Sequence, residues 1–310
     1  MAFVATGPRH GPTTLFRSTD GGAHFERAVA PRPRASGGPM TLQSLVFTDP
    51  AHGYALLGPD WPSTVLETTS DGGRSWSRDD LPRGPWRGIL GVDGHGAIAY
   101  AVALRRGTCQ CRVGLFLRRT DAFRWHYVSA LPRRDDEGGI GMAAWGGSLW
   151  LTLGVGNTRR PVTLFSADAG STFRRLPPLQ AVSCGLTATS PTIVWVDCST
   201  GMLMAFLRYD GTHVQHLGPW GAGTANTDLA ALSGSVAVFH SGGGRWAGVW
   251  VTSDGGRHFV RTGSLAGLRP ENVAGDPSFL TPQIGLDDVY GHGLFRTVDG
   301  GSTWHRVPLE

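Results

Sequence analysis

Arginines and tryptophans in the segments between apolar runs are the residues of this chain best suited to bind a ligand. All 28 basic residues among the 310 are arginine, and half of them fall in such segments. A guanidinium stays charged and binds carboxylates through two parallel hydrogen bonds, and an indole face packs on cations. Together they favour an anionic ligand, a sugar or an acidic protein surface. The strongest candidates are Arg105, Arg106, Arg133, Arg134, Arg159, Arg160, Trp61, Trp86 and Trp246.

The alternative interpretation of these arginines is compositional. A GC-rich genome favours arginine over lysine, and the other half of the arginines lie on predicted strands and hairpins. The net charge of +4 is mild and comes without a basic stripe in a recognisable nucleic-acid-binding module, so no nucleic-acid partner is predicted.

The four cysteines suggest disulfide chemistry more than metal binding. Cys184 and Cys198 fall on successive predicted strands, where they could face each other as a cross-strand disulfide, and this would imply an oxidising compartment. Cys109 and Cys111 lie in a predicted loop and could form a small disulfide or remain thiols. A zinc site would need further ligands at a suitable spacing. No metal or cofactor is therefore expected, and no phosphate-binding loop or nucleophile elbow is present.

These candidates must be positioned by a repeated element. The pattern Ser/Thr-x-Asp-x-Gly-x-x-Trp/Phe occurs five times, and two weaker copies surround Asp121 and Asp210. The seven aspartates are 51, 50, 47, 42, 44 and 45 residues apart. A period of about 40–50 residues is typical of one propeller blade. The five aspartates of the complete copies are Asp20, Asp71, Asp168, Asp254 and Asp299.

Each copy lies between two strand-like runs and is typical of a hairpin turn. In the second copy, Val65–Thr68 precedes the motif and Trp76–Arg78 follows it. Glycine takes the positive φ that a tight hairpin needs, and a short Asp side chain accepts N–H groups of its own turn. With further runs at 41–48 and 53–58, the pattern predicts four strands per blade and an all-β, seven-bladed propeller.

The repeat resembles the Asp-box, or bacterial neuraminidase repeat, over almost the whole chain. The resemblance implies that the motif joins the third and fourth strands of each blade, on the face opposite the functional one. The five aspartates would then be structural rather than catalytic. The chain looks most like the small propellers described as photosystem II stability or assembly factor-like, which implies a bacterial binding scaffold with an arginine-rich docking face.

The first blade is expected to be incomplete. Only three strand-like runs, 2–6, 13–18 and 24–29, are available for it. We expect its innermost strand to be missing because this sequence starts partway into the natural one, whose earlier part would also hold a signal peptide; a three-stranded first blade is the alternative. The continuous repeats predict one domain over 1–310, and no apolar run is long enough for a transmembrane segment.

The predicted function is non-catalytic, extracytoplasmic binding of a protein partner or of a carbohydrate or anionic ligand on the face opposite the motifs. The alternative is a glycoside hydrolase resembling the exo-sialidases, which share the repeat. Their chemistry needs three arginines on a substrate carboxylate, an Asp acid and a Tyr nucleophile beside a Glu. The available residues are Tyr54, Tyr100, Tyr127, Tyr209, Tyr290, Glu26, Glu67, Glu137, Glu271 and Glu310.

Overall fold

The structure is a computed structural model. It describes residues 2–6, 14–31, 40–59, 63–82, 84–105, 113–122, 124–131, 140–153, 162–177, 183–199, 204–217, 227–241, 248–263, 275–289 and 292–309.

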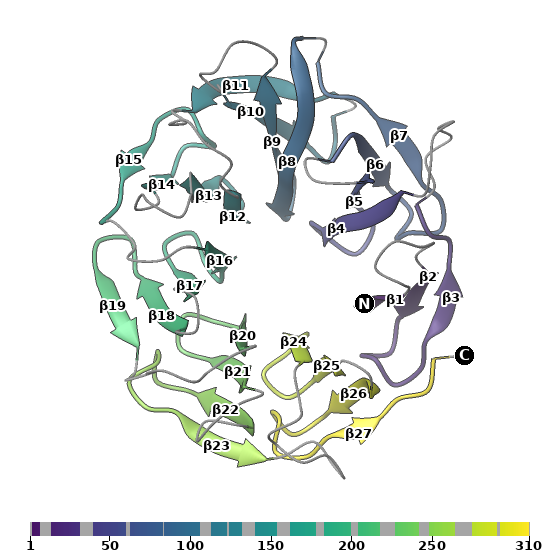
Figure 1. Cartoon of the computed structure of the whole chain (residues 1–310), viewed down its shortest axis with the longest axis vertical. Helices are drawn as coiled ribbons and strands as arrows, with labels where there is room; N and C mark the ends of the chain where they lie inside the picture. Colours follow the sequence, from purple (N-terminus) through teal and green to yellow (C-terminus); the bar gives the residue numbers. More distant parts are fainter. Residues whose placement is uncertain are drawn as a thin grey trace. The chain divides into compact units, whose positions relative to one another are not determined.

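The chain is an all-β, seven-bladed β-propeller, which confirms the predicted fold class. Its described strands form seven antiparallel sheets, and within each sheet the strands lie side by side in chain order (Figure 1). The first sheet has three strands and each of the others has four. Among the described residues, no helix is long and apolar enough to span a bilayer.

The strands of the first four sheets alternate with turns and longer connections. The first sheet contains β1 (Ala2–Thr6), β2 (Thr14–Ser18) and β3 (Glu26–Ala28). The second contains β4 (Thr41–Phe47), β5 (Gly53–Gly58), β6 (Val65–Thr69) and β7 (Ser77–Asp79). The third contains β8 (Trp86–His95), β9 (Ile98–Arg105), β10 (Val113–Arg119) and β11 (His126–Leu131). The fourth contains β12 (Ile140–Trp145), β13 (Ser148–Leu153), β14 (Val162–Ser166) and β15 (Arg174–Arg175).

The remaining three sheets repeat the same plan. The fifth contains β16 (Ser183–Ala188), β17 (Val194–Ser199), β18 (Met204–Tyr209) and β19 (Val214–Leu217). The sixth contains β20 (Thr227–Ala231), β21 (Ala237–Ser241), β22 (Gly248–Thr252) and β23 (Val260–Gly263). The seventh contains β24 (Gly275–Phe279), β25 (Gly285–Val289), β26 (Gly293–Thr297) and β27 (His305–Arg306).

The residues group into two compact units. One comprises Met1–Phe3, Arg17–Glu26 and Gln180–Glu310, and the other comprises Val4–Phe16 and Arg27–Leu179. Residues of the first sheet are thus divided between the two. That the whole chain is a single domain stays a prediction.

Within each unit, neighbouring sheets pack face to face through buried apolar side chains. Leu115 on β10 and Leu151 on β13 belong to one core cluster, which joins the third and fourth sheets. Trp195 on β17 and Phe239 on β21 do the same for the fifth and sixth. Alternate residues of a strand face opposite sides, so each central strand contributes to the packing on both of its faces. The burial of both faces explains why these strands are almost continuously apolar.

Side-chain hydrogen bonds to backbone carbonyls connect adjacent sheets as well. The Tyr100 hydroxyl donates to the Gly146 carbonyl at 3.0 Å. Arg208 Nε donates to Gly234 at 2.7 Å, and Arg296 Nε donates to Gly21 at 2.8 Å. The last of these joins the seventh sheet to the turn that follows β2, across 275 residues of sequence.

The Asp93 carboxyl on β8 links the third sheet to the fourth and makes stability depend on pH. Its Oδ2 accepts the Ala144 N–H at 2.8 Å, while His95 stacks on Trp145 nearby. Burial raises the pKa of Asp93 to about 7, against the opposing hydrogen bonds from the Gly94 and Ala144 backbone. Burial also lowers the pKa of His95.

We expect the contribution of Asp93 to the free energy of unfolding to fall as the pH rises from about 4 to 7. In that window the folded state holds a proton on Asp93 that the unfolded state has lost, so the slope is about −1.4 kcal/mol per pH unit at its steepest. Asp93→Asn keeps the acceptor for Ala144 and removes this component. Urea unfolding of both proteins across pH 4–8 measures the difference; parallel pH profiles would contradict it.

Candidate functional site

Each of the five complete motifs forms a self-contained turn, here called an aspartate turn. The turns are Ser18–Phe25, Thr69–Trp76, Ser166–Phe173, Thr252–Phe259 and Thr297–Trp304. In the third, the Ser166 hydroxyl donates to Asp168 Oδ1 at 2.7 Å and accepts the Gly170 N–H at 2.8 Å. Asp168 Oδ1 also accepts the Thr172 N–H at 2.9 Å, and Oδ2 accepts the Thr172 hydroxyl at 2.6 Å. The other four turns repeat this pattern, with His or Ser replacing Thr172 in some.

The donors within each turn stabilise the charged form of its aspartate. The Thr172 hydroxyl, the Thr172 backbone N–H and the Ser166 hydroxyl lower the pKa of Asp168 to about 2. In Asp71 the Ser75 hydroxyl contributes most, and the pKa is also about 2. Carboxylates whose oxygens are already engaged by their own turn make poor acids for catalysis. This geometry favours the structural role implied by the resemblance.

The two weaker copies of the motif lack the full network. Arg208 occupies the position of the motif's hydroxyl residue, two before Asp210, and the Asp210 carboxylate accepts only the nearby groups of Thr212 and His213 among the described contacts. Asp121 pairs instead with the exposed Arg119 at 3.1 Å. The sheets therefore form with or without a complete aspartate turn.

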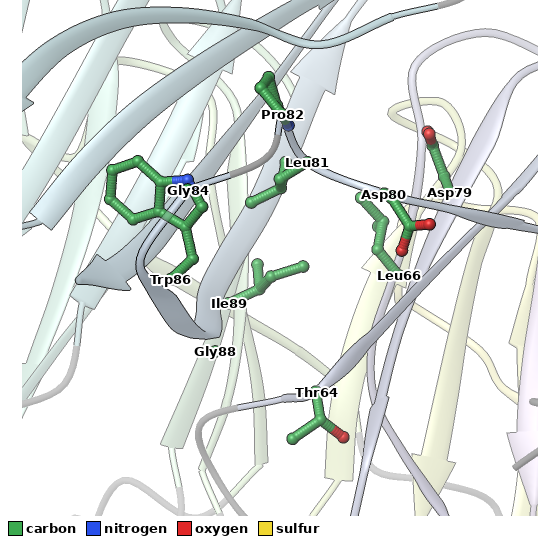
Figure 2. A pocket seen from close by; sticks show the side chains of 10 residues that line it. All are labelled: Thr64, Leu66, Asp79, Asp80, Leu81, Pro82, Gly84, Trp86, Gly88 and Ile89. Atoms are coloured by element: carbon green, nitrogen blue, oxygen red, sulfur yellow. The ribbon is translucent and has the colours of Figure 1, made fainter. Parts of the chain in front are cut away.

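A cavity of about 220 Å³ lies between the second and third sheets, at the ends of their strands opposite the aspartate turns. Thr64 directly precedes β6, which runs toward its aspartate turn, and Asp79 ends β7, which runs away from that turn. Both residues therefore lie at the ends of their strands far from the turn, and β8 begins nearby at Trp86. Figure 2 shows the residues that line the cavity. They are Thr64, Leu66, Asp79, Asp80, Leu81, Pro82, Gly84, Trp86, Gly88 and Ile89.

The Trp86 indole forms one wall and is held in place from several sides. Its ring meets the edge of Phe116, with centroids 4.9 Å apart, and stacks beside Tyr127 at 6.0 Å. A Cβ at Gly114 would lie 2.5 Å from the indole, so only glycine leaves room for the ring on β10. Tyr127 is 51% exposed, and the two rings together form an accessible aromatic surface.

Behind the cavity, Asp79 takes part in a buried polar network between the second and third sheets. The carboxylate pairs with Arg118 and accepts the Trp125 indole N–H at 2.9 Å. Arg118 also lies over the Tyr54 ring, 5.8 Å from its centroid. Burial raises the pKa of Asp79, and the charge of Arg118 and the hydrogen bond from Trp125 oppose that rise.

The structure brings two of the predicted ligand-face residues together. Trp86 and Arg105 were expected in loops, but they are the first residue of β8 and the last of β9, and they pair across the two strands. Bulges in β8, between Trp86 and Gly88 and between Ile89 and Gly91, shift the register, and the pairing with β9 continues past them to Trp86. Seven other candidates lie outside the described residues: Arg106, Arg133, Arg134, Arg159, Arg160, Trp61 and Trp246.

Several residues considered for hydrolase chemistry are engaged in packing. Tyr54 and Tyr100 are fully buried, and the Tyr100 hydroxyl donates to a backbone carbonyl. Glu26 pairs with Arg17 beside the first aspartate turn. Tyr290, Glu137, Glu271 and Glu310 lie outside the described residues. Sequence analysis did not single out Asp79, Asp80 or Tyr127 for the docking face. Asp79 comes to the cavity from the second sheet, and Tyr127 meets Trp86 across the strands of the third.

Cys184 and Cys198 lie opposite each other on β16 and β17 and are joined by a disulfide. Both side chains are buried in the fifth sheet, at 9% and 0% exposure. Cys109 and Cys111 lie outside the described residues. No group of three or more potential metal ligands occurs within the described part of the chain.

Comparison with known proteins identifies the fold. No protein-family model and no curated protein matches the chain. Among solved structures, it is similar to YCF48 bound to D1 peptide, with 18% identity over 86% of this chain and 81% of the other, at a TM-score of 0.59. YCF48 from Cyanidioschyzon merolae matches 96% of this chain and 99% of its own, with 13% identity and a TM-score of 0.57. A prolyl endopeptidase structure matches 99% of this chain but 48% of its own, with 12% identity and a TM-score of 0.58.

Proposed function

We propose that the protein is a non-catalytic binding propeller that docks a segment of a partner protein at the strand ends opposite its aspartate turns. The observation that carries the proposal is the cavity between the second and third sheets, with the Trp86 indole as a fixed wall. A held aromatic side chain beside a concave site is typical of positions that dominate binding energy.

Two further observations support a peptide ligand outside the cytoplasm. A structure with the same fold was determined as YCF48 bound to D1 peptide, which makes a peptide a reasonable class of ligand for this propeller. The disulfide between Cys184 and Cys198 favours an oxidising compartment, so the proposal places the protein outside the cytoplasm.

Selection of displayed random peptides on the purified protein tests the proposal. We expect selected peptides to bind the wild type, and Trp86→Ala to weaken them by about 30-fold, as loss of an aromatic hot spot of about 2 kcal/mol implies. Trp76→Ala is the matched control, because Trp76 is also half-buried but lies in an aspartate turn. We expect it to change the Kd by less than about threefold.

Three results would contradict the proposal. One is the absence of any enriched peptide, and another is equal weakening by Trp86→Ala and Trp76→Ala. The third is release of fluorophore from a sialoside or from aryl glycosides above the blank, which would favour the glycoside hydrolase. Thermal unfolding of both variants checks that each is folded at the temperature of the binding measurement.

A further inference from the structure

The charged groups that line the cavity are carboxylates. Among its described lining residues the only ionised side chains are Asp79 and Asp80. Asp79 is 11% exposed and already engaged by Arg118 and Trp125. Asp80 is 77% exposed and pairs with Arg78, whose Nε donates to Oδ1 at 3.2 Å. Exposed ion pairs of this kind contribute about 0–1 kcal/mol, so a ligand can replace Arg78 at little cost.

The other surfaces of the cavity are aromatic and apolar. In Figure 2, Trp86 and Asp80 lie on opposite sides, and Leu81 and Ile89 lie between them. Contacts with Phe116 and Tyr127 fix the indole before any ligand arrives. The volume of about 220 Å³ leaves room for one long side chain.

We propose that the cavity takes one arginine or lysine side chain of the docked partner segment, with its methylene stem on Leu81 and Ile89 and its cationic end between the Trp86 indole and the Asp80 carboxylate. An aromatic face and a carboxylate are the two groups that best hold a cation with an apolar stem. This inference rests on the proposed function and narrows it to partners that present a basic residue.

A cationic ligand is the opposite of the anionic ligand expected from the loop arginines. A substitution at Arg105 distinguishes between the two kinds of ligand. Arg105 is exposed and pairs with Trp86 across the strands, but it does not line the cavity. Its charge repels a cation bound beside Trp86 and attracts an anion there. Arg105→Gln must therefore shift the two classes of ligand in opposite directions.

The experiment titrates the full chain with three small probes at low salt, followed by saturation-transfer NMR of the probe protons. The probes are the N-acetyl, N-methylamide derivatives of arginine, citrulline and glutamate. Citrulline has the shape of arginine without its charge. We expect the arginine probe to bind at least fivefold more tightly than the citrulline probe, with transfer to its methylene protons. We expect Asp80→Asn to weaken it at least fivefold, and Arg105→Gln and Arg78→Gln each to strengthen it about twofold.

Equal affinity of the arginine and citrulline probes would overturn the inference. So would an unchanged affinity in Asp80→Asn, or tighter binding of the glutamate probe that Arg105→Gln abolishes. Because Asp80 is an exposed side chain, its variant is expected to keep the wild-type thermal midpoint. Selected peptides that need Trp86 but contain no basic residue would leave the proposed function standing while this inference falls. If the arginine probe binds but no peptide is selected, the proposed function falls while the cation-binding cavity stands.

Discussion

Arg118→Met is expected to lower the free energy of unfolding by about 3–5 kcal/mol, because it leaves the Asp79 carboxylate buried without its cation. The side chains of Arg118 and Asp79 are only 13% and 11% exposed, so water cannot replace the missing charge. The Trp125 N–H would remain as a donor to the carboxylate, but a neutral donor compensates for only part of the burial. Chemical unfolding in urea measures the loss.

The neighbouring residue supplies the control. Arg119 also pairs with an aspartate, Asp121, but these side chains are 62% and 68% exposed. We expect Arg119→Met to cost less than about 1 kcal/mol. The double variant Asp79→Asn, Arg118→Met should recover part of the loss, since no unpaired charge remains. Equal effects of the two single arginine variants would show that the buried ion pair does not stabilise the contact between the second and third sheets.

Gly170→Ala is expected to cost about 2–5 kcal/mol, through a backbone effect and a steric one. Gly170 has φ of +84°, a conformation that costs an L-residue about 1–2 kcal/mol. A Cβ there would lie 2.3 Å from the Leu115 Cδ2 atom on β10, and Leu115 is fully buried. Forcing an extra methyl group into a packed core costs about 1–3 kcal/mol more. Thermal or urea unfolding of the variant measures the sum.

Gly147→Ala is the matched control for this substitution. Gly147 precedes β13 in the same sheet, has no positive φ, and has open space around the position of an added Cβ. We expect its effect to stay within about 0.5 kcal/mol. A Gly170→Ala protein as stable as Gly147→Ala would contradict this packing argument.

The repeat was sufficient to predict the seven sheets, because each motif joins the last two strands of a sheet. Where the aspartate turn is complete, as in Thr69–Trp76, the flanking strands follow the predicted pattern closely. β24 was not located from the sequence, since Gly275–Phe279 has no apolar run and contains Pro277. Proline is tolerated there because β24 is the first strand of its sheet and needs hydrogen bonds on one side only.

The cavity was less accessible to sequence reasoning. Trp86 was a candidate, but its place at the start of β8 depends on bulges that leave no clear trace in the residue pattern. The pair of Asp79 and Arg118 joins residues 39 positions apart on different sheets. Such contacts depend on how two sheets pack against each other. The sequence period predicts the strands and turns within each sheet but not the contacts between sheets.

The hydrogen bond from Arg296 to the Gly21 carbonyl has a consequence for synthesis on the ribosome. The Ile284 and Leu286 side chains pack on the same early turn, near Gly21 and Gly22. The nascent turn therefore lacks its contact with Arg296 until 275 further residues have been synthesised. At 5–20 residues per second this delay is on the order of ten seconds to a minute. During that interval its apolar surface is exposed to chaperones and to other unfinished chains.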